Sequence, residues 1–394
     1  MRKLAAILGA LALLVLLAFA FLPALIEAAL NRVGQRPPYA AKAWARELMH
    51  DSVDLHADPL LWGRDLLQRS SRGQVDLPRL QEAGAALQVF GTVTQAPLGM
   101  NIARNESTAP DLISALAFLS RWPRPTWSSL RARALYTAQR LREMEERSGG
   151  AFVPVRSRAE LQALLDARAR GSQAVGALLA LEGSQALEGD LGSVDALYEA
   201  GFRMMAPTHF TDTEISGSAH GVSRGGLSPL GRAWLRKLEE KRIIVDLAHA
   251  SGQTVADVLA AAARPVVVSH TGVKATCDSP RNLADAQLAA LKKNGALVGI
   301  GYFPWAICGD DARAIARAMR HAADVLGVDH LALGSDFDGA VKTPFDVTGL
   351  PLLAEALRAE RFTDAEIRAI ASQNALRFFG AQLPQGGPPA VLHP

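Results

Sequence analysis

An α/β fold of the (β/α)8, TIM-like barrel type is predicted for this chain of 394 residues by three observations. Eight short apolar runs recur along the chain. Amphipathic stretches with the spacing of helices separate them, and alternating strands and helices are typical of a parallel barrel. Polar side chains that can bind metal ions stand at the carboxyl ends of the runs, which is the edge where such barrels carry their active sites.

The eight runs have the composition of buried parallel strands, because they are nearly continuous in apolar residues instead of alternating with polar ones. Each is short and bounded by polar or turn-forming residues. In chain order they cover residues 52–56, 86–90, 175–182, 202–209, 243–249, 265–270, 296–303 and 330–336.

The stretches between the runs carry helix signals. Residues 157–169 and 193–201 are amphipathic, and Gly201 fits a helix C-terminus. Residues 228–241 begin with Ser228 before a proline, a favourable start for a helix. We therefore expect the barrel to cover residues 46–381.

Residues 97–150 fit this alternation least well. They contain "RWPRPTW" and an Arg-rich helical pattern. We expect a mostly helical insertion after the second strand, which would shape a pocket mouth or a dimer contact.

The first 30 residues differ from the rest. Arg2 and Lys3 precede 23 uncharged residues, Leu4 to Ile26, which as a helix would cross a hydrocarbon core of about 30 Å. We expect a transmembrane anchor over 1–30 with the barrel outside the cytoplasm, on the periplasmic side of a bacterium. A cleaved signal that releases a secreted protein stays open, because "AFA" at 18–20 fits a cleavage site. Residues 31–45 are expected to be a linker, and the Pro/Gly-rich residues 382–394 a disordered tail.

Composition excludes several classes of function. The net charge is only +3, and the basic residues are scattered among acids, so nucleic acid is not an expected partner. Cys277 and Cys308 are the only cysteines, which excludes a thiolate zinc site or a disulfide scaffold. One disulfide between them is compatible with an oxidising compartment.

The carboxyl ends of the runs bring together side chains with metal-binding and acid–base chemistry. In a (β/α)8 barrel these ends meet at one rim, so seven such residues in that place favour a catalytic centre over seven separate structural roles. They are His56 and Asp58, Glu182, His209, His249, His270 and Asp336.

Five of the seven form a plausible ligand set for two metal ions: His56, Asp58, Glu182, His249 and His270. This mixture of nitrogen and oxygen donors suits zinc. A single catalytic zinc keeps three protein ligands, so five donors suit two ions if one carboxylate bridges. We expect Glu182 to bridge, with His56 and Asp58 on one ion, His249 and His270 on the other, and a hydroxide or water between the ions.

Six stretches carry a resemblance to a known family. In chain order they are "DLHAD", "LALEGSQAL", "MAPTHF", "IIVDLAHAS", "PVVVSHTGVKATCDSPRNL" and "GSDFDG". Together they resemble the membrane dipeptidase (renal dipeptidase) family of zinc peptidases, within the amidohydrolase-like barrels. The segment "THFTDTEISGSAHG" is similar to bacterial relatives. The resemblance implies a binuclear zinc barrel with the five ligands above, substrate contacts from His209, Arg281 and Asp336, and a homodimer.

The expected activity is zinc-dependent hydrolysis of free dipeptides, with the family's tolerance for a C-terminal D-residue. His209 would donate a hydrogen bond to the developing oxyanion, and Asp336 would carry the proton from nucleophile to leaving amine. Arg281 would hold the substrate's terminal carboxylate, although without the resemblance a surface salt bridge explains it equally well. Two alternatives stay open: a binuclear amidohydrolase acting on lactones or N-acyl amino acids, and an anchored binding protein with a decayed site. The latter would lack ligands, and every expected position is filled.

Overall fold

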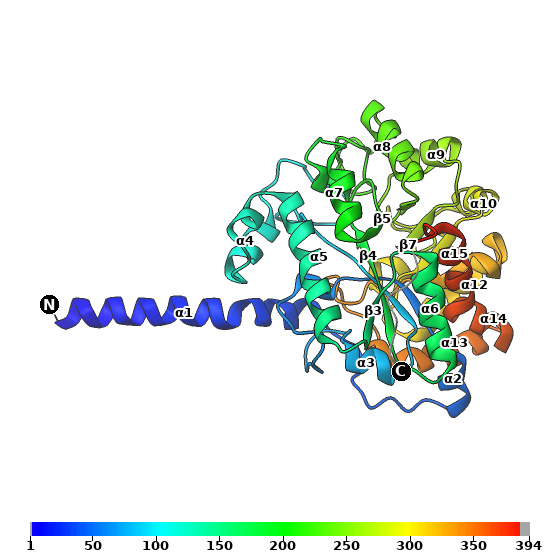
Figure 1. The fold of residues 1–394 in the computed structure, drawn as a ribbon, viewed down its shortest axis with the longest axis horizontal. Helices are drawn as coiled ribbons and strands as arrows, with labels where there is room; N and C mark the ends of the chain where they lie inside the picture. Colours follow the sequence, from blue (N-terminus) through cyan, green and yellow to red (C-terminus); the bar gives the residue numbers. More distant parts are fainter. Residues whose placement is uncertain (1, 387–394) are drawn as a thin grey trace.

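The computed structural model describes residues 2–386, except for most side chains between residues 2 and 20. Each of the eight apolar runs overlaps a strand of one parallel sheet (Figure 1). The strands are β1 (Val53–Ala57), β2 (Leu87–Phe90), β3 (Phe152–Pro154), β4 (Val175–Leu181), β5 (Phe202–Met205), β6 (Ile244–Val245), β7 (Val267–Thr271), β8 (Leu297–Ile300) and β9 (Leu331–Leu333).

The sheet curls until its two end strands meet. Its strand order is β6-β5-β4-β2-β1-β9-β8-β7, with every pair parallel. An isolated parallel bridge joins Asp246, after β6, to Val267 of β7, and the Leu247 N–H donates to the Val267 carbonyl at 2.8 Å. The α/β fold is thus consistent with a TIM-like barrel.

Strand β3 was not expected. It pairs only with β4 and lies off the main path of the sheet. Its sequence is only three residues long and ends in Pro154, which cannot donate a ladder hydrogen bond and is confined to sheet edges. So short an edge strand gives no run that periodicity can detect.

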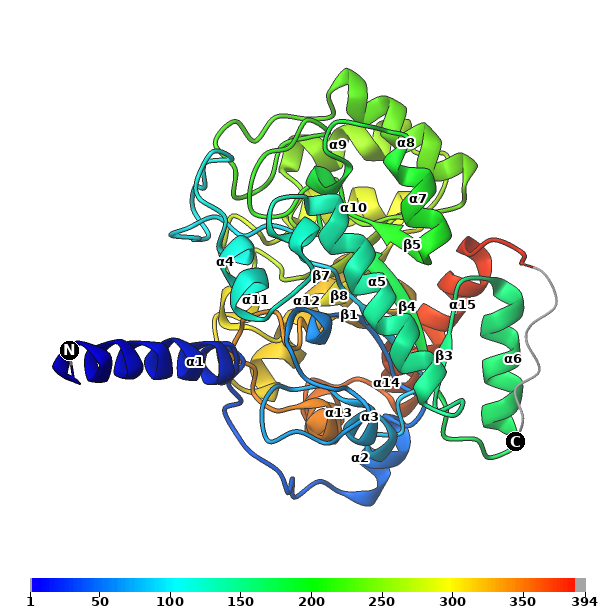
Figure 2. The same ribbon diagram turned by 60° about the vertical axis from the view of Figure 1, so that its left-hand side comes forward.

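Helices surround the sheet on its outer side (Figure 2). The apolar side chains beneath them are fully buried, among them Trp234 and Phe202. The longer helices are α1 (Arg2–Leu30), α4 (Leu112–Leu119), α5 (Leu130–Arg147), α6 (Arg158–Ala169), α7 (Ser193–Ala200), α8 (Pro229–Glu240), α9 (Gly252–Ala261), α10 (Asp285–Asn294), α12 (Ala312–Leu326), α13 (Leu350–Ala359) and α15 (Asn374–Gln382). The shorter ones are α2 (Ala43–Leu48), α3 (Leu77–Glu82), α11 (Pro304–Ile307) and α14 (Asp364–Arg368).

Helix α1 projects from the body of the molecule, and only its C-terminal part lies against it (Figures 1 and 2). Among the residues that the structure describes, no helix combines the length and the apolarity needed to cross a membrane. The predicted membrane segment over 1–30 therefore gains no support from this finding, and many of its side chains lie outside the described residues. The predicted tail is described only as far as residue 386.

Two further features position the site. Helices α4 and α5 occupy much of residues 97–150, and α4 lies beside α1 in both views. A disulfide links Cys277, in the loop after β7, to Cys308 at the end of α11, with the two Cα atoms 5.2 Å apart. It ties the loop that carries Arg281 to the segment after β8.

Candidate metal and substrate site

The site forms at the carboxyl ends of the strands, as the barrel interpretation requires. His56 lies in β1 and His270 in β7, and Asp58 and Glu182 directly follow β1 and β4. The remaining three residues lie in loops, three to four residues beyond their strands. They are His209 after β5, His249 after β6 and Asp336 after β9.

Two of the loop residues have unusual backbones. His249 has φ of 63° and Asp336 has φ of 61°, in the left-handed region that most side chains avoid. Strands β6 and β9 are also shorter than their apolar runs, because the chain turns early at these ends. Such conformations persist where the surrounding structure holds them, and they cluster at functional sites.

The Glu182 carboxylate is the centre of the cluster. Its Oε1 lies 2.9 Å from Nε2 of His249 and 3.3 Å from Nε2 of His270. Nε2 of His209 lies 3.6 Å from the same oxygen, and Nε2 of His56 lies 3.5 Å from Oε2. One carboxylate thus faces imidazoles on both of its oxygens, which is the arrangement a bridging ligand needs.

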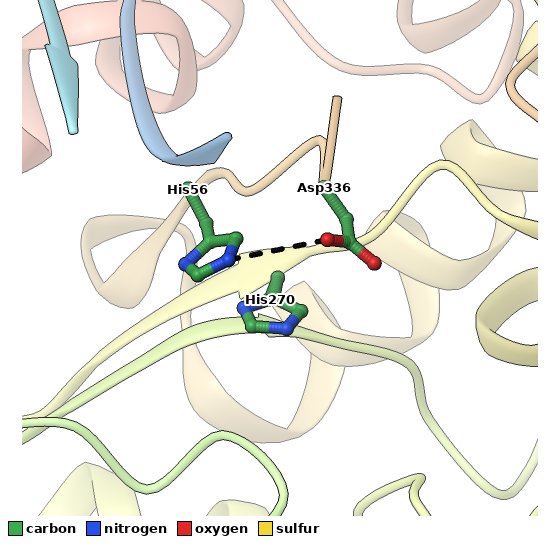
Figure 3. A group of neighbouring side chains, drawn as sticks. All are labelled: His56, His270 and Asp336. Carbon is green, nitrogen blue, oxygen red and sulfur yellow. Dashed lines mark ion pairs between the residues drawn. The ribbon is translucent and has the colours of Figure 1, made fainter. Parts of the chain in front are cut away.

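Asp58 and Asp336 complete the side of the cluster nearest β1. His56 Nε2 lies 3.4 Å from Oδ2 of Asp58 and 4.0 Å from Oδ1 of Asp336. Figure 3 shows the Asp336 carboxylate directed toward His56, with the His270 ring alongside. The rings of His56 and His270 are stacked with centroids 3.9 Å apart.

Three overlapping groups have ligand atoms within 4.8 Å of one another. One is the expected set of His56, Asp58 and Glu182. The other two differ from the expected second set: Glu182 groups with His209 and His249, and His270 groups with His56 and Asp336. His209 and Asp336, expected to contact substrate, therefore also belong to groups whose ligand atoms could hold a metal ion.

Two observations show that the residues fit metal ions. Asp58 Oδ1 and Glu182 Oε2 are buried acceptors with no hydrogen-bond partner among the described residues, although buried polar atoms are normally paired. The chain also keeps space beside them, since a Cβ on Gly91, directly after β2, would lie 2.2 Å from Asp58 Oδ1. Buried carboxylates and imidazoles in such a cradle are a donor set for zinc or a similar cation.

The pKa values agree with a ligand cluster. Burial alone would raise the pKa of the Glu182 carboxyl, but the surrounding imidazoles outweigh burial and hold the pKa well below its ordinary value. Burial lowers the pKa of His249 and His270, so both rings are neutral. Burial would also lower the pKa of His56, but the two neighbouring carboxylates outweigh it and raise that pKa. The carboxylates around His56 thus favour positive charge at the place where a cation would bind.

An outer hydrogen-bond chain orients His270. The Ser269 hydroxyl donates to Asp246 at 2.5 Å, so it accepts from Nδ1 of His270 at 2.8 Å. Nδ1 therefore carries the proton and Nε2 presents its lone pair to the cluster. Such outer contacts fix the tautomer of metal-binding histidines, and the sequence signal for this one was the serine directly before His270.

Arg281 also faces the cluster. Its Nη2 donates to the His270 carbonyl at 2.9 Å, Nη1 lies 2.8 Å from Nε2 of His249, and the guanidinium lies 4.8 Å from the centre of the Phe303 ring. The side chain is buried, and no carboxylate of the described residues lies within ion-pair distance of it. The surface salt bridge considered from sequence is wrong, because Arg281 is a buried cation without an anionic partner.

A cavity of about 280 Å³ opens onto these residues. The polar part of its lining consists of Asp58, Glu182, His209, His249, Arg281 and Asp336. The structure therefore brings together every residue expected at the site. Sequence reasoning missed Gly91 and Ser269, and it also missed the apolar lining that comes from α1 and α4.

Comparisons with known proteins place the chain in a family. The model of the family described as membrane dipeptidase (peptidase family M19) matches residues 43–384. The crystal structure of dipeptidase AC, a metallopeptidase of family M19, is 25% identical with a TM-score of 0.70, covering 86% of this chain and 100% of that chain. A metallopeptidase from Rhodobacter sphaeroides, bound to a phosphinate mimic of the dipeptide L-Ala-D-Ala, is 25% identical with a TM-score of 0.67, covering 85% and 99%.

A third solved structure is the probable dipeptidase PvdM from Pseudomonas aeruginosa. It has a TM-score of 0.72 at 17% identity, and the match covers 86% of this chain and 97% of that chain. At this identity the likeness shows a shared fold.

Proposed function

The chain belongs to the membrane dipeptidase family, peptidase family M19, and on this premise we propose that it is a zinc-dependent dipeptidase that hydrolyses free dipeptides, including those with a C-terminal D-residue. The family makes it a metallopeptidase and a hydrolase. The phosphinate mimic of L-Ala-D-Ala in the Rhodobacter sphaeroides structure supports the D-residue.

The observation that carries the dipeptide assignment is the buried guanidinium of Arg281, which lies beside the candidate metal ligands and has no carboxylate of the described residues as an ion-pair partner. A buried charge is costly unless an opposite charge or several hydrogen bonds compensate it. The terminal carboxylate of a dipeptide supplies both, through two parallel hydrogen bonds. Cleavage at any bond other than the last would place an uncharged amide there, so the clamp restricts hydrolysis to the C-terminal peptide bond, which in a free dipeptide is the only one.

We propose two zinc ions, held by His56, Asp58 and Glu182 on one side and by Glu182, His249 and His270 on the other. The donor set and the two unpaired acceptor oxygens support this assignment. When bound, the ions supply a Lewis acid for the peptide carbonyl and a water of lowered pKa.

The chain's own residues position the substrate and move protons. His209 lines the cavity with its Nε2 3.6 Å from Oε1 of Glu182, and it donates a hydrogen bond from Nε2 to the developing oxyanion. Asp336 takes the proton released by the attacking water and passes it to the leaving amine, a role that its position beside His56 and at the cavity wall supports.

We propose attachment to a membrane through the N-terminal segment, with the barrel outside the cytoplasm. The uncharged run after Arg2 and Lys3 supports this location, and so does the disulfide, because disulfides persist in oxidising compartments. The resemblance to the family further supports a homodimer. Cell fractionation with protease accessibility tests the location, and light scattering of the purified chain tests the dimer.

The test of the function uses the full chain in detergent. Metal content per chain is measured together with hydrolysis of Ala-D-Ala, Ala-Ala, an N-acetylated dipeptide and a simple lactone. About two zinc ions per chain and cleavage of the free dipeptides alone is the expected result. Two ions with turnover of the lactone or the N-acetylated compound, and inert dipeptides, would overturn the dipeptidase assignment and leave the metal site standing.

A further inference from the structure

The end of helix α1 reaches the substrate cavity. Ile26 and Leu30 both line it, and residues four apart lie on the same face of a helix. Figures 1 and 2 show that this end is the part of α1 that meets the body of the molecule. An N-terminal segment that served only for attachment or targeting would have no reason to present side chains to the substrate cavity.

The lining of the cavity is of two chemical kinds. The charged residues and imidazoles of the metal and substrate site form its polar part. Helices α1 and α4 contribute to its apolar part, with Ile26, Leu30, Leu112, Ile113, Leu116 and Leu119. Ligand pockets of this kind combine a mostly apolar lining with a few convergent polar groups, so the apolar lining is suited to a side chain of the substrate.

A buried ion-pair network holds the C-terminal part of α1, which forms one wall of the cavity, in place. Glu27 is only 1% exposed and pairs with Arg64 and, at 3.1 Å, with Arg72. Arg64 also pairs with Asp338 at 2.5 Å, two residues after Asp336. The next residue along α1 from Ile26 is thus tied to the loop that carries the expected proton carrier, which holds the wall at a set position relative to the reacting groups.

Aromatic packing adds a second attachment. The ring of Phe19 on α1 packs edge-on against Phe118 of α4 with centroids 5.1 Å apart, and Phe118 packs against Trp127 at 5.0 Å. The two helices that contribute apolar side chains to the cavity, α1 and α4, are therefore also in contact with each other.

We infer that the C-terminal turn of α1 is a specificity element in which Ile26 and Leu30, with Ile113 and Leu116 of α4, select dipeptides that carry a large apolar side chain. The inference rests on the proposed dipeptidase function and adds the class of substrate to it. Its physical basis is the removal of apolar surface from water on both the wall and the substrate. One methylene group in an apolar pocket changes discrimination between substrates by about tenfold or more.

The experiment measures kcat/KM for Leu-Leu and for Ala-Ala with the full chain in detergent. The ratio of the two values is compared between wild type, Ile26→Ala and Ile26→Trp. The matched control is Leu25→Ala, because Leu25 is the neighbouring residue of α1 and is 63% exposed. We expect Ile26→Ala to lower the Leu-Leu to Ala-Ala ratio about tenfold. Ile26→Trp should lower it as well, by filling the cavity, while Leu25→Ala leaves it unchanged.

The outcomes separate this inference from the proposed function. A wild-type protein that cleaves neither dipeptide contradicts the function itself. A wild type that cleaves both, with the same ratio in all four proteins, overturns only the role of α1. Metal content is measured for each variant, and an Ile26 variant with full metal content and an altered ratio supports the inference independently of folding.

Discussion

Gly91 lies so close to Asp58 that a Cβ at position 91 would stand 2.2 Å from the Asp58 Oδ1 atom and 2.7 Å from Cε1 of His56. No side chain projects from Gly91 at the end of β2, and this leaves room for the ligands that the neighbouring strands carry. The absence of a side chain is here a requirement of the metal site, because both nearby side chains belong to the expected ligand set.

Gly91→Ala should therefore weaken metal binding. The added methyl group must displace the Asp58 carboxylate, and we expect a loss of metal affinity of about ten- to a hundredfold, as found when ligand orientation is disturbed. Competition with a chromophoric chelator measures the affinity. Gly380→Ala is the matched control, because a Cβ at Gly380 meets nothing within 4 Å. Equal affinities in the two variants would show that the space beside Asp58 is not needed.

Asp336→Asn should abolish most dipeptide hydrolysis while metal stays bound. Proton transfer by a positioned carboxylate contributes about 10²- to 10⁴-fold to the rate, and the amide has a similar size without that function. Metal analysis and kcat are measured on the same preparation. Loss of one metal ion in the variant would instead identify Asp336 as a ligand, in agreement with its grouping with His56 and His270.

Arg281→Lys tests the carboxylate clamp. The lysine keeps the charge but loses the paired donors, so kcat/KM for Ala-Ala should fall about 10- to 100-fold, through loss of hydrogen bonds to a charged group. The matched substrate is the same dipeptide with its carboxyl group amidated. The substitution should change turnover of this substrate little. A parallel loss on both substrates would mean that Arg281 supports the site without gripping the carboxylate.

Glu145 should make the stability of the fold depend on pH. Burial raises the pKa of its carboxyl to about 7, with the Arg156 guanidinium 4.0 Å away only partly offsetting that effect. A raised pKa in the folded state favours folding at low pH. That contribution to stability is lost as the pH rises from about 4.5, the ordinary pKa of the carboxyl in the unfolded chain, through about 7, its pKa in the folded chain.

Glu145→Gln should therefore raise the free energy of unfolding at pH 8, by up to about 3 kcal/mol, and change it little at pH 4.5. Chemical unfolding of metal-loaded wild type and variant at several pH values measures the difference, in which contributions from other titrating groups cancel. The exposed neighbour offers the control Glu146→Gln. If Glu145→Gln raised the free energy of unfolding equally at both pH values, the raised pKa of Glu145 would be contradicted.

Strand geometry made the cluster around Glu182 predictable from sequence. Parallel strands place their carboxyl ends at one rim, so seven polar residues at the ends of apolar runs were sufficient to predict that they meet. The loop residues His209, His249 and Asp336 also reach the cluster, although they lie several residues beyond their strands. The exact grouping of ligand atoms could not be predicted, because it depends on left-handed backbone positions at His249 and Asp336.

Features that depend on contacts between distant segments could not be predicted from sequence. Gly91 affects the metal site only through the side chain that it lacks. Ile26 reaches the cavity because α1 packs against α4, which lies much further along the chain. Strand β3 escaped detection because three residues ending in a proline carry no periodicity. Without the family resemblance, a surface salt bridge explained Arg281 as well as substrate binding did, since only the fold reveals that its side chain is buried.

The disulfide between Cys277 and Cys308 makes oxidation part of how this protein matures. It closes a loop across a separation of 31 residues, which in the chain-entropy account is worth about 3–4 kcal/mol. That loop contains Arg281 and the strand β8 that comes after it. A chain kept in a reducing compartment lacks this cross-link and the stability that it adds. Recombinant production in an oxidising compartment, or refolding with a glutathione couple, is accordingly the route to a homogeneous enzyme.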